Sequence, residues 1–172
     1  MNLVVDVVSM EFIAVTEENY PELVQIYQQG IATGMATFET SAPSYEDWDQ
    51  AHLPFGRILA VENDQVLGWA SLAKVSDRCV YGGVAENSIY VTPSAQGKGV
   101  GTKLLNKLIE ISEANGIWTL QCGIMRANKA SIALHEKCGF RIIGYREKIG
   151  KLQGVWKDNI ILERRSTKVG VD

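Results

Sequence analysis

A glycine-rich stretch constrains the fold of this chain more than any other part of its sequence. It reads Gln96-Gly97-Lys98-Gly99-Val100-Gly101 and follows an apolar run, Ile89 to Val91, that is typical of a strand. In the residues after it, Leu104, Leu108 and Ile111 recur at helical spacing. A strand therefore runs into a turn that opens a helix. Such a turn directs several backbone N–H groups and the positive end of a helix dipole to one point, which suits a phosphate or pyrophosphate group.

Two better-known glycine-rich loops do not fit this stretch. A P-loop requires Gly, four residues and then Gly-Lys-Ser/Thr, but counting from Gly97 the second glycine position holds Thr102. A dinucleotide-binding fingerprint requires a third glycine, and Thr102 again takes its place. The pattern that fits is Gln/Arg-x-x-Gly-x-Gly/Ala after a strand, formed by Gln96, Gly99 and Gly101. The alternative is an ordinary glycine-rich turn that caps a core helix.

Composition and charge exclude several classes of function. The chain has 172 residues and a net charge of −3, with no cluster of Lys and Arg, so we expect no nucleic-acid partner. It has no run of about 18 apolar residues and hence no expected membrane span. The segment Met1 to Met10 lacks a basic start, which makes it a poor signal peptide. Cys79, Cys122 and Cys138 are widely spaced, which predicts reduced cysteines in a cytoplasmic protein and no metal site.

The order of local patterns predicts one mixed α/β fold. Asn19 with Glu22 predicts a capping box, Ser44 predicts a helix N-cap, and Asn63-Asp64-Gln65 predicts a hairpin turn. The resulting order, β-α-α-β-β-β-α-β-α-β-β, indicates a mixed sheet with helices on both faces. We expect a single domain over residues 1–172, with its core at about 11–165 and a disordered tail. The expected strands are 11–15, 58–62, 66–74, 86–91, 118–124, 140–148 and 155–163; the expected helices begin near residues 20, 45, 102 and 130.

Beyond the glycine loop, four motifs resemble a known family. The loop resembles the acetyl-CoA pyrophosphate loop of the GNAT superfamily, in which it joins the fourth strand to the third helix. The four motifs resemble the phosphinothricin and methionine-sulfoximine acetyltransferase group, and the resemblance runs from about Phe12 to Arg164. It implies a GNAT fold with a mostly antiparallel sheet of about seven strands. Gln153 departs from the pattern, since many members carry His there. The motifs are 36–40 (ATFET), Arg78 and Tyr81 followed by 85–91 (AENSIYV), 128–140, and 154–158 (GVWKD).

The resemblance implies that a substrate amine attacks the thioester of acetyl-CoA directly. The amine arrives as an ammonium, so a base must remove a proton, and Glu86 matches the base proposed for the group. Strand alternation places Glu86 on one face with Ser88 and Tyr90; its alternative role is a solvated strand-edge carboxylate. His135 lies one helical turn after Ser131 and could stabilise or protonate the leaving thiolate. The alternative is a structural histidine.

The family pattern also implies the residues that hold the cofactor. Lys98 could add a screened contact or remain solvated. Asn128 precedes a helix, where a contact with the pantetheine arm and a plain helix cap are compatible, and Ser131 could take either role. The implied cofactor-binding residues are Ile89, Tyr90, Val91, Gln96, Gly97, Lys98, Gly99, Val100, Gly101, Thr102, Asn128 and Ser131.

Three residues are implied to bind the acceptor. Arg78 could hold an amino-acid carboxylate bidentately and Tyr81 could add a hydrogen bond, unless Arg78 is only a surface charge. Phe38, with Met35, could wall the side-chain pocket. Trp156 and Asp158 would shape the far side of the site, whereas we expect Trp69 and Trp118 in the core.

The resemblance implies an acetyl-CoA-dependent N-acetyltransferase for a small amino acid or analogue, of the kind that detoxifies methionine sulfoximine or phosphinothricin. Two alternatives remain open. One keeps the fold but uses a polyamine, an aminoglycoside or a protein N-terminus as acceptor, although no dense acidic cluster appears outside Glu46 to Asp49. The other is a non-catalytic acyl-CoA-binding module, which would bind without turnover. Relatives are commonly dimers, so we expect a homodimer.

Overall fold

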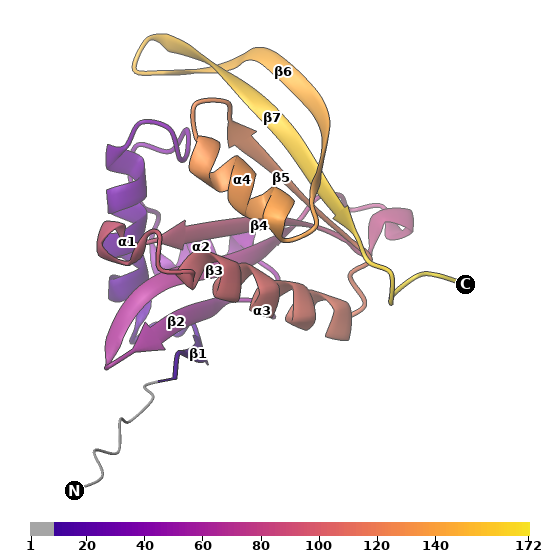
Figure 1. Cartoon of the computed structure of the whole chain (residues 1–172), viewed down its shortest axis with the longest axis horizontal. Coiled ribbons are helices and arrows are strands. Elements are labelled where there is room, and N and C mark those ends of the chain that lie inside the picture. Colours follow the sequence, from indigo (N-terminus) through magenta and orange to yellow (C-terminus); the bar gives the residue numbers. More distant parts are fainter. Residues whose placement is uncertain (1–8) are drawn as a thin grey trace, which may run out of the picture.

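The computed structural model describes residues 9–172; residues 1–8, which make up most of the mildly apolar segment Met1 to Met10, lie outside the described part. Seven strands and four α-helices follow one another in the predicted order (Figure 1). The strands are β1 Glu11–Ala14, β2 Ile58–Glu62, β3 Gln65–Lys74, β4 Val84–Val91, β5 Thr119–Met125, β6 Arg141–Leu152 and β7 Val155–Arg165. The helices are α1 Tyr20–Ala32, α2 Tyr45–Ala51, α3 Val100–Ala114 and α4 Lys129–Lys137, with short 3-10 turns at Cys79–Tyr81 and Pro93–Ala95.

The strands form one seven-stranded sheet in the order β1-β2-β3-β4-β5-β7-β6. Every neighbouring pair is antiparallel except β4 and β5, which are parallel. The predicted mixed, mostly antiparallel sheet is therefore confirmed. Because β7 lies between β5 and β6, the last two strands form a long hairpin at the edge of the sheet.

The parallel pair β4 and β5 separates along its length. The two strands pair only at Val84 with Thr119, Ala85 with Leu120 and Glu86 with Gln121. Beyond Glu86 they diverge, although β4 continues for five more residues and stays paired with β3 on its other side. The divergence leaves the β5-facing backbone groups of that part of β4 without a ladder partner. It opens a wedge in the middle of the sheet.

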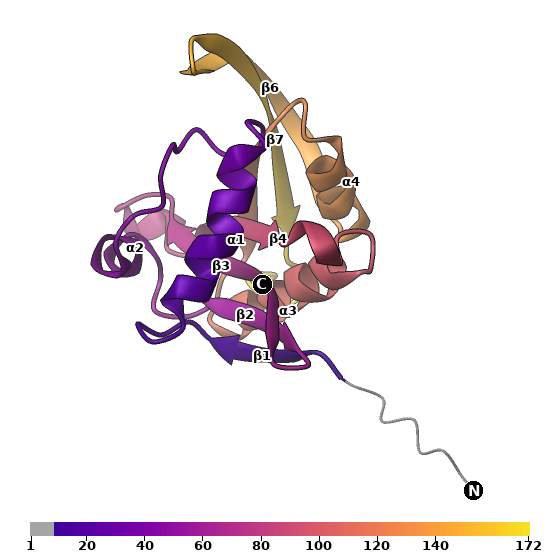
Figure 2. The same cartoon turned by 90° about the vertical axis from the view of Figure 1, so that its left-hand side faces the viewer.

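Helices cover both faces of the sheet, as the sequence predicted (Figure 2). On one face, α3 buries Leu104, Leu105 and Leu108 completely against β2 to β5, and each fully buried leucine contributes about 1.5–3 kcal/mol. On the other face, α1 and α2 pack Leu23 and Trp48 in a separate cluster that includes Trp69 of β3. The wedge therefore lies between two firmly packed halves.

Several chain reversals follow from local sequence signals. The Ser44 hydroxyl caps α2 by accepting from the Asp47 N–H at 3.2 Å. Asn63 and Asp64 both adopt positive φ, at 52° and 59°, which is the conformation that a two-residue hairpin needs. The capping box predicted at Asn19 is wrong. Its side chain accepts from the Thr16 N–H and donates to a carbonyl at the end of β1, so it ties the strand to the turn rather than capping α1.

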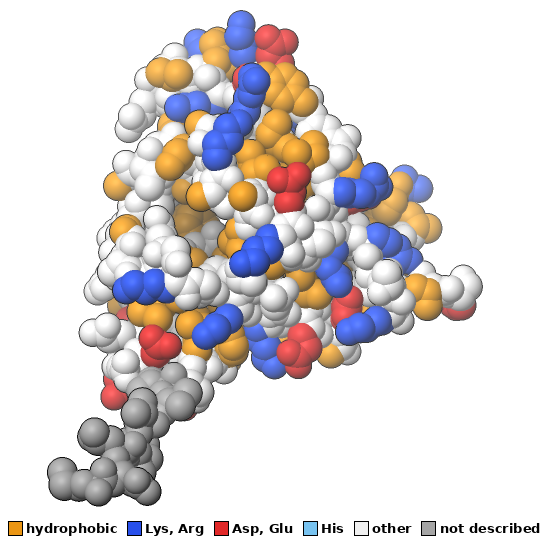
Figure 3. Space-filling view, viewed as in Figure 1, with side chains coloured by type: hydrophobic (Ala, Val, Ile, Leu, Met, Phe, Trp, Pro, Cys, Tyr) orange, Lys and Arg blue, Asp and Glu red, His pale blue; other side chains and the backbone are white. Residues whose placement is uncertain are grey.

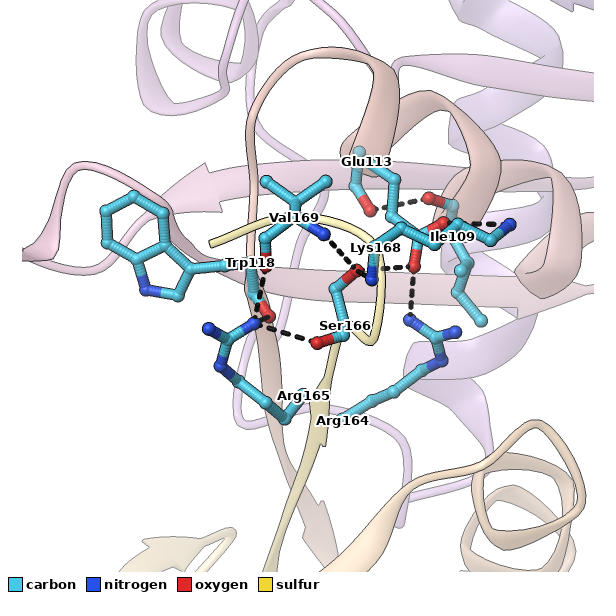
Figure 4. A network of polar contacts seen from close by, with 9 residues as sticks. Ile109, Glu113, Trp118, Arg164, Arg165, Ser166, Lys168 and Val169 are labelled. Atoms are coloured by element: carbon cyan, nitrogen blue, oxygen red, sulfur yellow. Dashed lines mark hydrogen bonds and ion pairs between the residues drawn. The ribbon is translucent and has the colours of Figure 1, made fainter. Parts of the chain in front are cut away.

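The residues after β7 contact the end of α3 (Figure 4). Glu113 accepts hydrogen bonds from Arg164 at 3.0 Å and from the Ser166 hydroxyl at 2.9 Å, and Lys168 lies 3.5 Å away. Arg165 donates to the backbone carbonyls of Trp118 and Val169. These contacts involve the start of the tail for which the sequence predicted disorder. Within residues 9–172, no helix combines the length and apolar character needed to cross a bilayer.

Candidate active site

The glycine loop ends at the first turn of α3. Gly97 and Gly99 adopt positive φ, 74° and 79°, and a Cβ at either position would meet nothing within 4 Å. Gly99 is the N-cap of α3 and has no side chain to cap it, so the first N–H groups of the helix keep their hydrogen-bonding capacity. The Val100 side chain is buried in the core and anchors the loop. The backbone thus presents free donors and the positive helix end to a bound anion.

A cavity of about 470 Å³ connects this loop to β4 and α4. A hollow between α1 and α4 is visible in the space-filling view (Figure 3). The side chain of Lys98 is exposed and does not line the cavity. Of the predicted cofactor-binding residues, those that line the cavity are Ile89, Tyr90, Val91, Gln96, Gly97, Gly99, Gly101, Thr102, Asn128 and Ser131.

The lining of this cavity, which runs from the glycine loop along β4 to α4, suits a nucleotide with a long arm. The loop can hold a pyrophosphate, and the unpaired edge of β4 can hydrogen-bond an extended arm in the manner of an added strand. Asn128 caps α4 by accepting from the Ser131 N–H at 3.2 Å, which leaves its amide N–H groups for a ligand. The residues present therefore fit acetyl-CoA.

A smaller cavity of about 80 Å³ lies within the wedge between β4 and β5. Asn87 and Ser88 line it from β4, Cys122 and Gly123 from β5, and His135 from α4. It shares Ile89, Asn128 and Ser131 with the larger cavity, among others. The arm of a nucleotide that starts at the glycine loop would therefore end here.

His135 is buried in the wedge, with 2% of its surface exposed. Its Nδ1 lies 2.7 Å from the Ser131 carbonyl oxygen, so this nitrogen carries the proton and donates. Burial lowers the pKa of His135, so the ring is neutral at pH 7 and Nε2 accepts from Asn87 Nδ2 at 3.0 Å. Both ring nitrogens are thus engaged. The other amide atom, Asn87 Oδ1, is buried without a partner among the described residues.

Glu86 lies on the opposite face of β4 from Asn87, because successive strand residues point to opposite faces. Its side chain is exposed, yet neighbouring groups remove part of its hydration. This desolvation raises the pKa of Glu86, and the positive charge of Arg146 on β6 offsets part of the rise. A carboxylate with a raised pKa at the point where β4 and β5 separate suits a general base. Arg146 was not identified from the sequence.

A further cavity of about 420 Å³ lies on the Glu86 face, between α1, α2 and strands β3 and β4. Ser88 and Tyr90 line both this cavity and the wedge. Trp69, predicted in the core, is 2% exposed and stacks on Tyr90 with ring centres 4.6 Å apart. Trp118 is half-buried rather than core, because it covers Gly83 at the other end of β4.

The predicted acceptor-binding residues do not gather at one point. Arg78 stacks over the Tyr81 ring at 5.4 Å, and both are exposed in the turn before β4, at the opposite end of that strand from the glycine loop. Neither lines the cavities around the wedge. Phe38 instead packs near Gly150, so the loop after α1 contacts the β6–β7 hairpin.

The fourth sequence motif lies on that hairpin. Asp158 accepts from the Tyr145 hydroxyl at 2.6 Å and from the Lys148 N–H at 2.7 Å, and these bonds hold an irregularity in β6. Trp156 is exposed and packs against Lys151. Within residues 9–172, no three His, Cys, Asp or Glu side chains gather as a metal site.

Known proteins resemble this chain over most of its length. The model of the acetyltransferase (GNAT) family matches residues 17–140. An L-methionine sulfoximine/L-methionine sulfone acetyltransferase of Pseudomonas paraeruginosa is 31% identical, over 80% of this chain and 84% of that protein. A phosphinothricin N-acetyltransferase of Alcaligenes faecalis is 31% identical, over 87% of this chain and 79% of that protein. The crystal structure of a GNAT superfamily phosphinothricin acetyltransferase from Sinorhizobium meliloti in complex with AcCoA has a TM-score of 0.84 at 27% identity, covering 95% of this chain and 91% of that one.

Proposed function

This chain belongs to the acetyltransferase (GNAT) family, and from that membership we propose that it transfers the acetyl group of acetyl-CoA to the α-amine of a small amino acid or analogue. The acceptors named for its relatives, methionine sulfone, methionine sulfoximine and phosphinothricin, define the class. The observation that carries the proposal is the wedge between β4 and β5, with the glycine loop at one end and Glu86 at the other. Acetylation removes the charge of the amine and would detoxify such compounds.

In this proposal the chain holds acetyl-CoA with backbone groups. The free N–H groups from Gly97 to Thr102 bind the pyrophosphate, and Lys98 adds a screened charge. The unpaired edge of β4, from Ile89 to Val91, binds the pantetheine arm opposite Asn128 and Ser131. The thioester, which supplies the activated acetyl group, then lies in the wedge beside Asn87.

Glu86 is the proposed base. It takes a proton from the acceptor ammonium, directly or through a water. The free amine then forms a C–N bond with the acetyl carbon while the C–S bond breaks. The nitrogen loses a second proton and the departing thiolate gains one, so CoA leaves as the thiol. No metal takes part in the proposed step.

We propose that His135 positions a neighbouring side chain and does not act as a proton donor. Its neutral ring holds the Asn87 amide and accepts no proton readily, because burial lowers its pKa. We therefore assign it the positioning of Asn87 at the end of the wedge. Phe38 would wall the acceptor site beside the hairpin. Arg78 and Tyr81 are the residues that the family pattern suggests for the acceptor carboxylate, and Arg146 is a second candidate because its charge acts on Glu86.

The test is a turnover assay with a panel of acceptors. CoA release from acetyl-CoA, followed with a thiol reagent, should depend on methionine sulfone, methionine sulfoximine or phosphinothricin, and mass spectrometry should find the N-acetyl product. Binding of acetyl-CoA without turnover across the panel would instead favour an acyl-CoA-binding module. Faster turnover of polyamines or aminoglycosides would assign another acceptor class.

Two further proposals concern the state of the protein in the cell. Exposed apolar residues on the β6–β7 hairpin, Ile142, Ile143, Tyr145, Ile149, Val155 and Trp156, support association into a homodimer, and light scattering would measure it. Cys79, Cys122 and Cys138 are all free, which supports a reducing compartment such as the cytoplasm.

A further inference from the structure

The cavity on the Glu86 face combines aromatic and acidic residues, and we name it the aromatic–acidic cavity. Four rings line it, from Tyr27, Trp48, Trp69 and Tyr90. Two carboxylates line it as well, Glu39 and Asp47, and both are exposed to solvent. The remaining lining residues are Ser41, Pro43, Ala51, His52 and Ser88, so no Lys or Arg is among them.

This cavity continues from the place where the thioester would end. Ser88 and Tyr90 belong to its lining and to that of the wedge. Glu86 precedes Ser88 by two residues and so shares its face of β4. The cofactor cavity extends in the other direction, towards the glycine loop and α4. An acceptor whose amine meets the thioester at Ser88 can therefore extend its side chain into the aromatic–acidic cavity.

The electrostatic character of the cavity is negative. Glu39 acts on two of the rings, because its charge adds to the effect of burial in raising the pKa of Tyr27 and of Tyr90. Burial lowers the pKa of His52, so its ring stays neutral at pH 7. Aromatic faces attract cations and offer nothing to an anion. A negatively charged guest would meet two carboxylates, and the Arg57 charge that acts on His52 is already paired with Asp49.

Two of the rings that line the cavity also carry buried N–H groups. The Nε1–H groups of Trp48 and Trp69 are buried and have no acceptor among the described residues. Each of these side chains is 2% exposed.

We propose that the aromatic–acidic cavity receives the side chain of the acceptor amino acid and selects neutral or cationic side chains against anionic ones. This inference rests on the proposed function and narrows it. Methionine sulfone and methionine sulfoximine carry no negative charge on the side chain, whereas phosphinothricin carries an anionic phosphinate. The chain should therefore acetylate the first two in preference to the third.

The test compares kcat/KM for methionine sulfone and phosphinothricin at low ionic strength. The full chain should prefer the sulfone by at least about tenfold, and added salt should reduce that ratio because it screens the carboxylates. Glu39→Gln combined with Asp47→Asn should reduce the ratio at least about fivefold. Glu46→Gln is the matched control, since this carboxylate lies in the same turn of α2 but does not line the cavity.

A second pair of variants adds charge without removing the carboxylates. Ala51 lies at the exposed end of α2 and lines the cavity. Ala51→Lys should lower the sulfone-to-phosphinothricin ratio, and Ala51→Glu should raise it. A wild-type preference for phosphinothricin, or ratios unchanged in all of these variants, would overturn the inference while leaving the acetyltransferase proposal intact. Turnover of no amino acid at all would overturn both.

Discussion

Asn87 on β4 and His135 on α4 are joined by a hydrogen bond of 3.0 Å across the wedge in the sheet. The two residues are far apart in the sequence, and both are nearly fully buried, at 4% and 2% exposed. The bond connects the strand that leads to the glycine loop with the helix that closes the cofactor cavity. It therefore fixes the end of the wedge where the reaction is proposed to occur.

The first prediction follows from this pair. His135→Ala leaves the Asn87 amide and the Ser131 carbonyl without a partner and opens a cavity, so it should destabilise the fold by about 2–4 kcal/mol. His135→Gln keeps an acceptor for Asn87, so its loss of unfolding free energy should be less than half that of His135→Ala. Chemical denaturation measures both. If His135 positions Asn87 and donates no proton, His135→Gln should also keep most of kcat without a change in the pH profile. Loss of a limb of that profile near neutral pH would instead show that His135 acts as a proton donor.

The second prediction concerns the proposed base. Glu86→Gln removes the proton acceptor while keeping the size of the side chain, so kcat/KM should fall by about 10²- to 10⁴-fold. The affinity for CoA should stay within about twofold, because the side chain does not line the cofactor cavity. Steady-state kinetics and calorimetry measure the two quantities. Undiminished turnover in the variant would remove Glu86 from the mechanism.

The third prediction is a pH shift that depends on Arg146. Glu86 acts as a base only when ionised, so kcat/KM should rise with pH through a pKa above the ordinary value, since desolvation raises it. The charge of Arg146 holds that pKa down. Arg146→Met should move the acid limb to higher pH, whereas Arg146→Lys should leave it nearly in place. Identical profiles in all three proteins would show that this charge does not reach the base.

The fourth prediction concerns the contacts at the end of α3. Burial alone would raise the pKa of Glu113, but its hydrogen bonds from Arg164 and Ser166 and the nearby positive charges outweigh burial and lower it. A lowered pKa adds stability above the pKa of the unfolded chain, and that stability is lost as pH falls through the folded value. Glu113→Gln should therefore cost about 1.5–3 kcal/mol at pH 7 and progressively less in acid.

Glu110→Gln is the control for this measurement. Glu110 lies on the same helix in an exposed ion pair with Lys107, so its loss should change the free energy of unfolding by less than about 1 kcal/mol. Urea denaturation at several pH values compares the two variants. A Glu113→Gln deficit that is constant from pH 7 to pH 3 would contradict the assignment.

The sequence predicted the parts of the fold that short-range patterns control. The order of strands and helices, the Ser44 cap and the Asn63–Asp64 turn are all confirmed, because each depends on residues within one or two turns of chain. The prediction of a capping box at Asn19 was wrong for a related reason. Its side chain had competing partners at the end of β1, which the local pattern could not reveal.

Long-range features of the site could not be predicted from the sequence. The sheet order places β5 and β7 between the strands of Glu86 and Arg146, yet the charge of Arg146 acts on Glu86. Neither fact follows from periodicity. Alternation did place Asn87 opposite Glu86, and that signal could have suggested a buried polar residue facing α4. The aromatic–acidic cavity was missed because Trp69 was correctly predicted as buried but its neighbours across α2 could not be identified.

The central claim is that the backbone at the start of α3 binds the pyrophosphate of CoA, and two glycines on this helix test it. Gly99 at its N-terminus and Gly116 just past its C-terminus both have positive φ, 79° and 78°, and open space around the Cβ position. Asp at either position imposes a similar backbone strain, but only Gly99→Asp brings a negative charge to the phosphate site. Isothermal titration of each protein with CoA should show 1:1 binding to the wild type and to Gly116→Asp, and a Kd at least about tenfold weaker for Gly99→Asp. Equal affinity of the two variants, or no binding to the wild type, would contradict the account.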